Sequence, residues 1–359
     1  MKRLFAILIA VILVMQVLLG CKTANTNFSD EGTNLESTEQ GSNSSTNTGE
    51  GEEAMNIEEM KKVLRLPNRA VDVVLDTDAY NEIDDQFAIA YMLANDDRIK
   101  CQAIYAAPFL NNRSESAKDG MEKSYNELVH ILTLCKREDM IEKSYKGSES
   151  FLVDEKTPVI SDAANDLVRR AKSYSRENPL YVIAIGAITN IASALLIDPS
   201  IKDNIVIVWL GGNARHWVNT AEFNMIQDIA AARVVFSSGA PLVQLPCEGV
   251  VSSFRISETE IDKYLVGKNE LCDYLASNVK AYYGSKEGAW TAVIWDVTAV
   301  AWLINDGGRY MLDRYEGPIM PEYNRHYSYP DKEGVMKYVF HIKRDELAND
   351  LFTKLANMQ

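Results

Sequence analysis

The feature that most constrains this fold is a pair of short segments that are apolar at every position. Residues 180–185 and 205–210 contain no charged side chain and are rich in β-branched residues. A strand that is apolar on both faces is typical of a parallel sheet covered by helices. Segments with helical spacing alternate with these runs along the chain. This order predicts a single-domain α/β fold with a mostly parallel open sheet and helices on both faces.

The remaining elements can be placed from the same patterns. The expected strands are 71–75, 99–105, 180–185, 205–210 and 241–245, and the expected helices are 84–95, 118–136, 163–175, 187–196 and 228–238. In such folds, ligands bind beyond the carboxyl ends of the strands. Polar residues gather there, because 76–85 follows the first strand and Gly211-Gly212-Asn213 follows another. We therefore expect the functional residues at this edge of the sheet.

The first 53 residues are organised like those of an exported protein. Two basic residues precede an apolar run over 4–19, which ends in Leu18-Leu19-Gly20-Cys21. A basic start, a short apolar stretch and small residues before a cleavage site are typical of a signal peptide. The last four residues resemble the lipobox of bacterial lipoproteins, in which the cysteine is lipidated. The alternative is an uncleaved transmembrane helix, for which about 20 apolar residues are typical.

We predict a signal peptide over 1–20, a lipidated Cys21 with a disordered tether over 21–53, and a folded domain over 54–359. The tether consists largely of Ser, Thr, Asn, Gly and Glu, which bury too little surface to offset the entropy of ordering. The protein is thus expected to be a bacterial, extracytoplasmic lipoprotein that meets the membrane only through Cys21. Four other cysteines could form disulfides there, although their scattered positions favour buried thiols: Cys101, Cys135, Cys247 and Cys272. The net charge of −14 argues against nucleic-acid binding.

The strongest chemical signal is an acidic loop, Asp76-Thr-Asp78-Ala-Tyr-Asn81-Glu-Ile-Asp84-Asp85, at the point where a strand turns into a helix. Carboxylates packed this closely repel one another, and hard oxygen ligands suit Ca²⁺ or Mg²⁺. Helix capping by Asp84 and Asp85, or a solvated acidic loop, are the structural alternatives. The Asp-x-Asp pair also occurs in haloacid-dehalogenase-like phosphatases, but there a β-hairpin usually follows. The loop favours a metal site.

Five motifs in this order resemble the inosine–uridine-preferring nucleoside hydrolases. They are the acidic loop, Ala184-Ile-Gly-Ala-Ile-Thr-Asn190, Leu210-Gly-Gly212, Ala221-Glu-Phe-Asn224 and Ile294-Trp-Asp296. The resemblance implies a nucleoside hydrolase-like fold around a Rossmann-like core. It also implies Ca²⁺-dependent cleavage of the N-glycosidic bond of ribonucleosides, by activated water and through an oxocarbenium-like transition state.

Carried onto this chain, the resemblance implies specific roles for named residues. Calcium would be bound by Asp78, Asp85, Asp296 and the backbone carbonyl of Ile185. Asp78 would also be the general base, and the ribose hydroxyls would be held by Asp84, Glu222 and Asn224.

Other positions depart from the family pattern. The acidic loop has five residues between Asp78 and Asp84, where the family's short form has three. Asn112 or its neighbour Asn111 is the nearest match to one family asparagine, and Asn219 to another, both with changed spacing. The histidine that often precedes the last calcium ligand, as leaving-group acid, is Trp295 here.

Two ways of activating the leaving group remain open. Aromatic stacking of the base could involve Trp217, Trp290 or Trp295, and His216 is the best-placed alternative acid. Trp295 as a packing residue and His216 as a surface residue are the structural alternatives. The predicted activity is therefore hydrolysis of a ribonucleoside or related riboside.

Two non-enzymatic functions are also compatible with this sequence. One is a riboside-binding surface lipoprotein that uses the same contacts without catalysis, and the other is a surface module in which calcium only ties the acidic loop to Asp296. Family members commonly form dimers or tetramers, so the resemblance allows a homo-oligomer.

Overall fold

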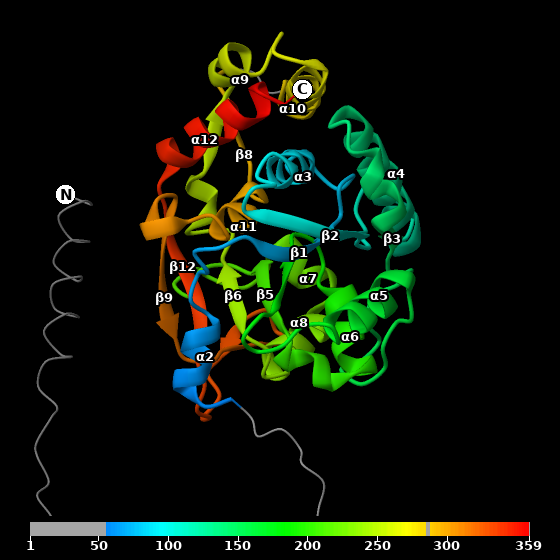
Figure 1. The fold of residues 1–359 in the computed structure, drawn as a ribbon, viewed down its shortest axis with the longest axis vertical. Helices are drawn as coiled ribbons and strands as arrows, with labels where there is room; N and C mark the ends of the chain where they lie inside the picture. Colours follow the sequence, from blue (N-terminus) through cyan, green and yellow to red (C-terminus); the bar gives the residue numbers. More distant parts are fainter. Residues whose placement is uncertain (1–54, 285–287, 359) are drawn as a thin grey trace, which may run out of the picture. The chain divides into compact units, whose positions relative to one another are not determined.

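The computed structural model describes residues 55–284 and 288–358, all of which belong to one compact unit, 53–359 (Figure 1). The predicted signal peptide, Cys21 and the tether up to residue 53 lie outside the described residues. Among the helices that the structure describes, none is both long and apolar enough to cross a lipid bilayer.

The unit is built around an eight-stranded sheet. Its strands are β1 (Val71–Thr77), β2 (Ile99–Ala106), β3 (Ser144–Lys146), β4 (Leu180–Ala184), β5 (Ile205–Leu210), β6 (Leu242–Leu245), β9 (Met311–Glu316) and β12 (Met336–Ile342). The spatial order is β3-β2-β1-β4-β5-β6-β12-β9. All neighbours pair in parallel except β12 and β9, which are antiparallel. The predicted mostly parallel open sheet is thus confirmed.

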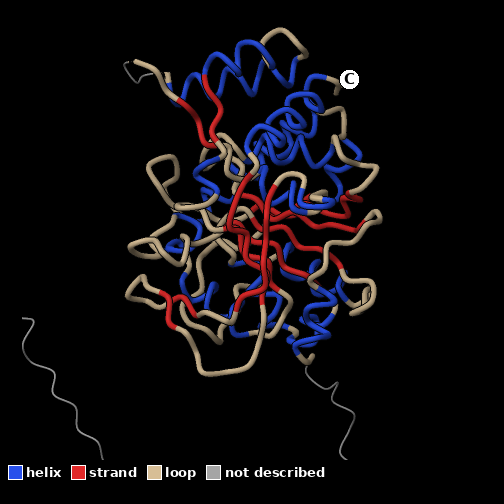
Figure 2. The backbone as a smooth tube through the Cα atoms, turned by 90° about the vertical axis from the view of Figure 1, so that its left-hand side faces the viewer, coloured by secondary structure: helices blue, strands red, loops and turns tan. Residues whose placement is uncertain are grey.

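Helices cover both faces of this sheet (Figures 1 and 2). On one face, α3 (Asp85–Leu93), α4 (Ala117–Leu134) and α11 (Val297–Trp302) pack directly against the sheet. Helices α12 (Arg344–Ala356), α10 (Glu270–Tyr283) and α9 (Glu258–Tyr264) lie farther out: α12 packs against α3, α10 against α4 and α12, and α9 against α10 and α12. The other face packs against α5 (Asp162–Ala171), α6 (Thr189–Ile197) and α8 (Ile229–Ser237). Helix α2 (Ile57–Val63) precedes β1, and the short helix α7 (Phe223–Gln227) precedes α8.

The two cores explain the continuous apolar runs. Along β4, Tyr181 and Ile183 face one core, whereas Val182 and Ala184 face the other. The same alternation occurs along β5, every residue of which is buried. Because side chains in a strand point to opposite faces in turn, a strand between two helical layers must be apolar throughout.

The smaller elements lie outside the main sheet. Strands β7 (Arg255–Ser257) and β8 (Thr291–Val293) form one antiparallel pair, and β10 (Met320–Pro321) and β11 (Tyr327–Ser328) form another. The described cysteines are free thiols, three of them buried and Cys101 partly so, as their positions predicted. Four parallel strands, β1, β4, β5 and β6, end side by side and carry the loops that form the site described next.

Candidate active site

A cavity of about 220 Å³ lies at the carboxyl ends of these strands. Its wall contains eight of the residues singled out from the sequence: Asp78, Asp84, Asp85, Ile185, Glu222, Asn224, Trp295 and Asp296. They come from segments more than 200 residues apart in the chain. The parallel topology brings them together because it places the ends of successive strands at one edge.

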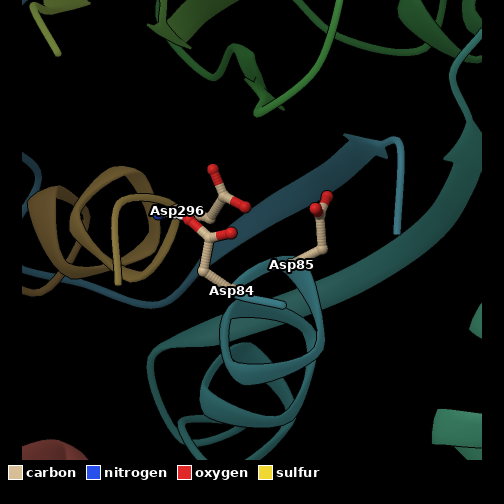
Figure 3. Close-up of side chains that lie close together, drawn as sticks. All are labelled: Asp84, Asp85 and Asp296. Atoms are coloured by element: carbon tan, nitrogen blue, oxygen red, sulfur yellow. Dashed lines mark hydrogen bonds between the residues drawn. The ribbon is translucent and has the colours of Figure 1, made fainter. Parts of the chain in front are cut away.

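Three of the carboxylates that line the cavity lie close together (Figure 3). Asp84 and Asp85 stand at the start of α3, and Asp296 immediately precedes α11. Each offers an oxygen within 4.8 Å of the other two. The backbone N–H of Asp296 donates to Asp84 at 3.3 Å, and the hydroxyl of Thr77 donates to Asp85 at 2.5 Å. Asp84 occupies the N-cap position but makes no capping hydrogen bond with its side chain, so capping does not account for it.

Asp78 lies on the same wall and is 1% exposed. Neither of its carboxylate oxygens has a hydrogen-bond partner among the described residues. Burial, and then the nearby charges of Asp85 and Asp84, raise the pKa of Asp78 well above its ordinary range. A buried carboxylate without donors is costly unless a cation or a ligand satisfies it. Asp78 therefore has the environment of a group that requires a partner.

Gly186 makes this position of Asp78 sterically feasible. A Cβ on residue 186 would lie 2.9 Å from the Oδ1 atom of Asp78 and 3.2 Å from the Cβ of Ala107. Only a glycine lets the backbone after β4 approach the carboxylate so closely.

The donor set fits a hard divalent cation. The cluster combines buried carboxylates with the nearby backbone carbonyl of Ile185, and such oxygen ligands are those that Ca²⁺ and Mg²⁺ prefer. Burial raises the pKa of Asp85 to about 7, and burial with repulsion from Asp84 and Asp85 raises that of Asp296 well above its usual value. A bound cation would relieve both effects, since it favours the ionised carboxylates.

Glu222 and Asn224 form the opposite side of the site. Glu222 caps α7, and its carboxylate accepts the backbone N–H groups of Gly212, Asn224 and Met225 at 2.8–2.9 Å. Burial raises the pKa of Glu222 to about 7, opposed by these hydrogen bonds. The Asn224 side-chain amide donates to the carbonyl of Ile185 at 3.1 Å and to that of Leu210 at 3.0 Å. Asn224 therefore ties together the ends of β4 and β5.

Four predicted residues are not among the described residues that line the cavity: Asn112, Asn219, His216 and Trp217. Asn112 is exposed, whereas its neighbour Asn111 donates to Asn81 at 2.6 Å. The Asn219 side chain accepts the backbone N–H of Ala221 at 2.9 Å. His216 is exposed and Trp217 is 43% exposed.

Two other aromatic candidates occupy different places. Trp295 is half-buried and lines the cavity. Trp290 stacks on Tyr283, with ring centroids 5.6 Å apart and planes 16° apart.

Sequence reasoning assigned no individual site role to five polar lining residues: Asn81, Glu82, Asn213, Cys247 and Glu248. Asn81 and Glu82 belong to the acidic loop, and the extra length of this loop was the feature that could have indicated that they line the cavity. Asn213 follows the paired glycines after β5 and was visible as a polar strand end. Cys247 and Glu248 follow β6, where no charge pattern distinguished them from other loop residues.

A cavity lined by buried carboxylates at the strand ends of a parallel α/β sheet is a suitable place for a divalent cation and a ligand. The sequence model described as "Inosine-uridine preferring nucleoside hydrolase" matches residues 73–338. The chain therefore belongs to this family.

Its curated relatives are distant. It is 30% identical over 151 residues to the pyrimidine-specific ribonucleoside hydrolase RihA of Enterobacter sp. (strain 638), which covers 39% of this chain and 47% of that protein. It is 26% identical over 252 residues to RihA of Klebsiella pneumoniae (strain 342), covering 62% and 80%. A probable uridine nucleosidase of Arabidopsis thaliana is matched over 43% of its length. The chain thus spans about half the length of the first relatives that it matches.

Solved structures are similar over nearly their full length. A purine-preferring ribonucleoside hydrolase from Gardnerella vaginalis superposes with a TM-score of 0.66 at 21% identity, over 80% of this chain and 98% of that one. The plant nucleoside hydrolase PpNRh1 gives 0.64 at 17% identity, over 80% and 99%. At these identities the likeness establishes the fold, which is the expected nucleoside hydrolase-like α/β architecture.

Proposed function

We propose that this protein is a Ca²⁺-dependent hydrolase that cleaves the N-glycosidic bond of a ribonucleoside or related riboside to a free base and ribose. The observation that carries the proposal is Asp78, a buried carboxylate with no hydrogen-bond partner among the described residues, beside the cluster of Asp84, Asp85 and Asp296. Family membership supports the reaction class. The relatives are named both as pyrimidine-specific and as purine-preferring enzymes, so the base that this protein releases is to be identified by experiment.

In this proposal Asp78, Asp85, Asp296 and the carbonyl of Ile185 hold the calcium ion. The ion, when bound, supplies Lewis acidity toward water and the ribose hydroxyl oxygens. Asp78 accepts the proton of the water that attacks the anomeric carbon, because its oxygens accept no hydrogen bond from the part of the chain that the structure describes. The hydrogen bond from Asn224 keeps the Ile185 carbonyl in place and leaves its second lone pair available.

The sugar is held between the two sides of the cavity. Asp84, Glu222 and Asn224 are the residues that bind its hydroxyls. Glu222 is fixed by three backbone donors and is therefore pre-organised, which lowers the cost of orienting the substrate. The carboxylates around the sugar stabilise the positive charge that develops in an oxocarbenium-like transition state.

The leaving-group side of the cavity contains Trp295, and no histidine is among its described lining residues. An indole cannot donate a proton to a leaving base at neutral pH. His216, exposed and outside the lining, would have to move to act as an acid. We therefore assign Trp295 to the aglycone side, where its ring stacks on a base.

The test is ribose release from a panel of ribonucleosides and an activated nitrophenyl riboside, with calcium and with a chelator. The variant is Asp78→Asn, and its matched control is Asp97→Asn, an exposed residue of the same type. Calcium-dependent release that Asp78→Asn abolishes supports the proposal.

The other outcomes identify the rival functions. Tight riboside binding without release identifies a non-catalytic binding protein. A calcium effect on melting alone, with no ligand effect, identifies a structural calcium module. Release that is unaffected by Asp78→Asn contradicts the assigned mechanism.

We further propose that the domain is anchored outside the cytoplasm through a lipid on Cys21, with residues 22–53 as the tether. The support is the Leu-Leu-Gly-Cys ending of the apolar run and the polar composition that follows it. Metabolic labelling with an alkyne fatty acid should label the full chain and leave Cys21→Ser unlabelled. Equal labelling of the two would contradict the anchor. Size-exclusion chromatography with light scattering would establish whether the protein is a homo-oligomer.

A further inference from the structure

The wall of the active-site cavity has an excess of negative charge. Seven of its described lining residues are acidic, and none is lysine, arginine or histidine: Asp78, Glu82, Asp84, Asp85, Glu222, Glu248 and Asp296. A divalent cation compensates two of these charges. A strong negative potential therefore remains, and a cavity with low-dielectric walls focuses it on whatever binds there.

Glu82 connects this cavity to a second one. The second cavity has a volume of about 380 Å³ and is lined by Glu82 together with Tyr80, Tyr274 and Tyr282. Burial raises the pKa of the Glu82 carboxyl, and the nearby positive charge of Arg113 opposes that effect. Arg113, which also lines the second cavity, lies 4.4 Å from the ring of Tyr80 and donates to two backbone carbonyls of the acidic loop. Arg113 thus holds the loop and also places one positive charge near Glu82 in the second cavity.

Aromatic rings continue from this second cavity. The Tyr282 and Tyr283 rings lie 5.0 Å apart, and Trp290 stacks on Tyr283. The charges of Glu82 and Asp84 both raise the pKa of the Tyr282 and Tyr283 hydroxyls, after the effect of burial. Tyr282 lines the same cavity as Glu82, and the Tyr283 ring is packed against that of Tyr282, so both rings lie beside the acidic loop. Carboxylates beside aromatic faces are the surroundings that favour an organic cation.

The chemistry of the leaving group also favours a cationic aglycone. A neutral base leaves with the electron pair of the broken bond and becomes an anion unless an acid protonates it. A base that is already a ring cation takes up the same electron pair and leaves as a neutral molecule. No acid is then needed, which accounts for Trp295 at the position where the family resemblance expects a histidine.

We infer that the preferred substrate is an N-riboside whose aglycone is a cationic nitrogen heterocycle, such as an N-ribosylpyridinium. This inference rests on the proposed function, because it names the substrate class of the same site. In the reaction the bond between C1′ and the ring nitrogen breaks, and its electron pair neutralises the ring. A water oxygen bonds to C1′, and the proton it loses passes to Asp78 and then to solvent. One cation and one water become ribose, a neutral base and one proton.

The first test measures binding without turnover. The probes are 1-methylnicotinamide, a ring cation, and nicotinamide, its neutral counterpart, titrated against the full chain with calcium by ligand-observed NMR. We expect the cation to bind about tenfold more tightly, in the range of a cation–π contact strengthened by nearby carboxylates. Glu82→Gln should remove most of this preference. Glu149→Gln, an exposed carboxylate paired with Lys118, should leave it unchanged. Equal affinity of the wild type for both probes would overturn the inference.

The second test separates this inference from the proposed function. Ribose release is measured from 1-ribosylnicotinamide, uridine and inosine, each corrected for its rate without enzyme. The inference is supported if the corrected kcat/KM for 1-ribosylnicotinamide is about tenfold or more above the values for uridine and inosine. Faster corrected turnover of uridine or inosine refutes it but leaves the proposed function intact. Release from none of the three with calcium present contradicts the proposed function itself.

Discussion

Replacing Gly186 by alanine tests how the site positions Asp78. The added Cβ would lie 2.9 Å from the Oδ1 atom and 3.0 Å from the Cγ atom of Asp78, closer than real Cβ atoms are found. The φ angle of Gly186 is not in the left-handed region, so the effect is a steric one rather than a backbone one. Overpacking of this kind costs about 1–3 kcal/mol, which in a domain of this size lowers Tm by about 2–6 °C.

The larger effect should be on calcium. The clash can be relieved only by moving the carboxylate or the backbone that follows β4, because Ala107 blocks another direction at 3.2 Å. We therefore expect the affinity for calcium to fall about tenfold, the usual cost of disturbing the orientation of a metal ligand. Isothermal titration calorimetry measures this affinity, and differential scanning calorimetry measures Tm. Gly317→Ala is the matched control, because nothing lies within 4 Å of its added Cβ.

The result that would refute this reasoning comes from a double mutant. In an Asp78→Ala background the carboxylate is absent. The loss of unfolding free energy caused by Gly186→Ala should then be smaller, because only the close contact with Ala107 remains. If Gly186→Ala costs as much in that background as in the wild type, Asp78 is not the group that requires the glycine. Unchanged calcium affinity in the single mutant would contradict the assignment of Asp78 as a ligand.

Three further outcomes are expected. Asp78→Asn should lower ribose release by about 100-fold or more with an unchanged circular dichroism spectrum, because a general base is lost and no core residue is removed. Removal of calcium by a chelator should lower Tm by about 5 °C, since saturating an ion at about 100 times its Kd contributes about 2.7 kcal/mol; an unchanged Tm would argue against a resident cation. Asn190→Ala should destabilise the fold by about 3 kcal/mol in urea denaturation. The Asn190 side chain donates to the buried Asp76 at 2.7 Å and accepts from Ser148 at 2.7 and 2.8 Å, so a loss below 1 kcal/mol would be inconsistent with this network.

The first two-thirds of the fold could be predicted because its signals are local. Each expected strand between residues 71 and 245 is present, and the helix ends differ by a few residues, as for α3, expected over 84–95 and observed over Asp85–Leu93. The sheet's antiparallel edge could not be placed in this way. Strand β12 pairs with β6 about 90 residues earlier in the chain, and β9 pairs only with β12. Periodicity indicates that a segment is a strand, but not which distant strand it joins.

The same difference between local and long-range signals applies to the site. The acidic loop and the motifs around Ile185, Glu222 and Asp296 are short and fixed to strand or helix ends, so the sequence placed them on one cavity wall. The residues around the leaving group come from longer connections. There, a change of one or two residues in length moves a side chain such as Asn112 to the surface, and spacing alone gives no register.

This division has a chemical reason. Every N-riboside presents the same sugar, so the side of the site that binds ribose can be built on strand ends that tolerate little change. Leaving groups differ in size, charge and need for a proton, and the loops that receive them vary accordingly. Trp295 illustrates this difference. It directly precedes Asp296, whose backbone N–H donates to Asp84, but its own indole side chain lines the cavity and cannot act as a proton donor to the leaving group. A substitution at Trp295 should therefore alter the selectivity between aglycones much more than the affinity for calcium. Trp295→His, assayed with neutral and cationic ribosides, should raise release from neutral ribosides relative to cationic ones. A uniform loss for all substrates would instead identify Trp295 as a packing residue.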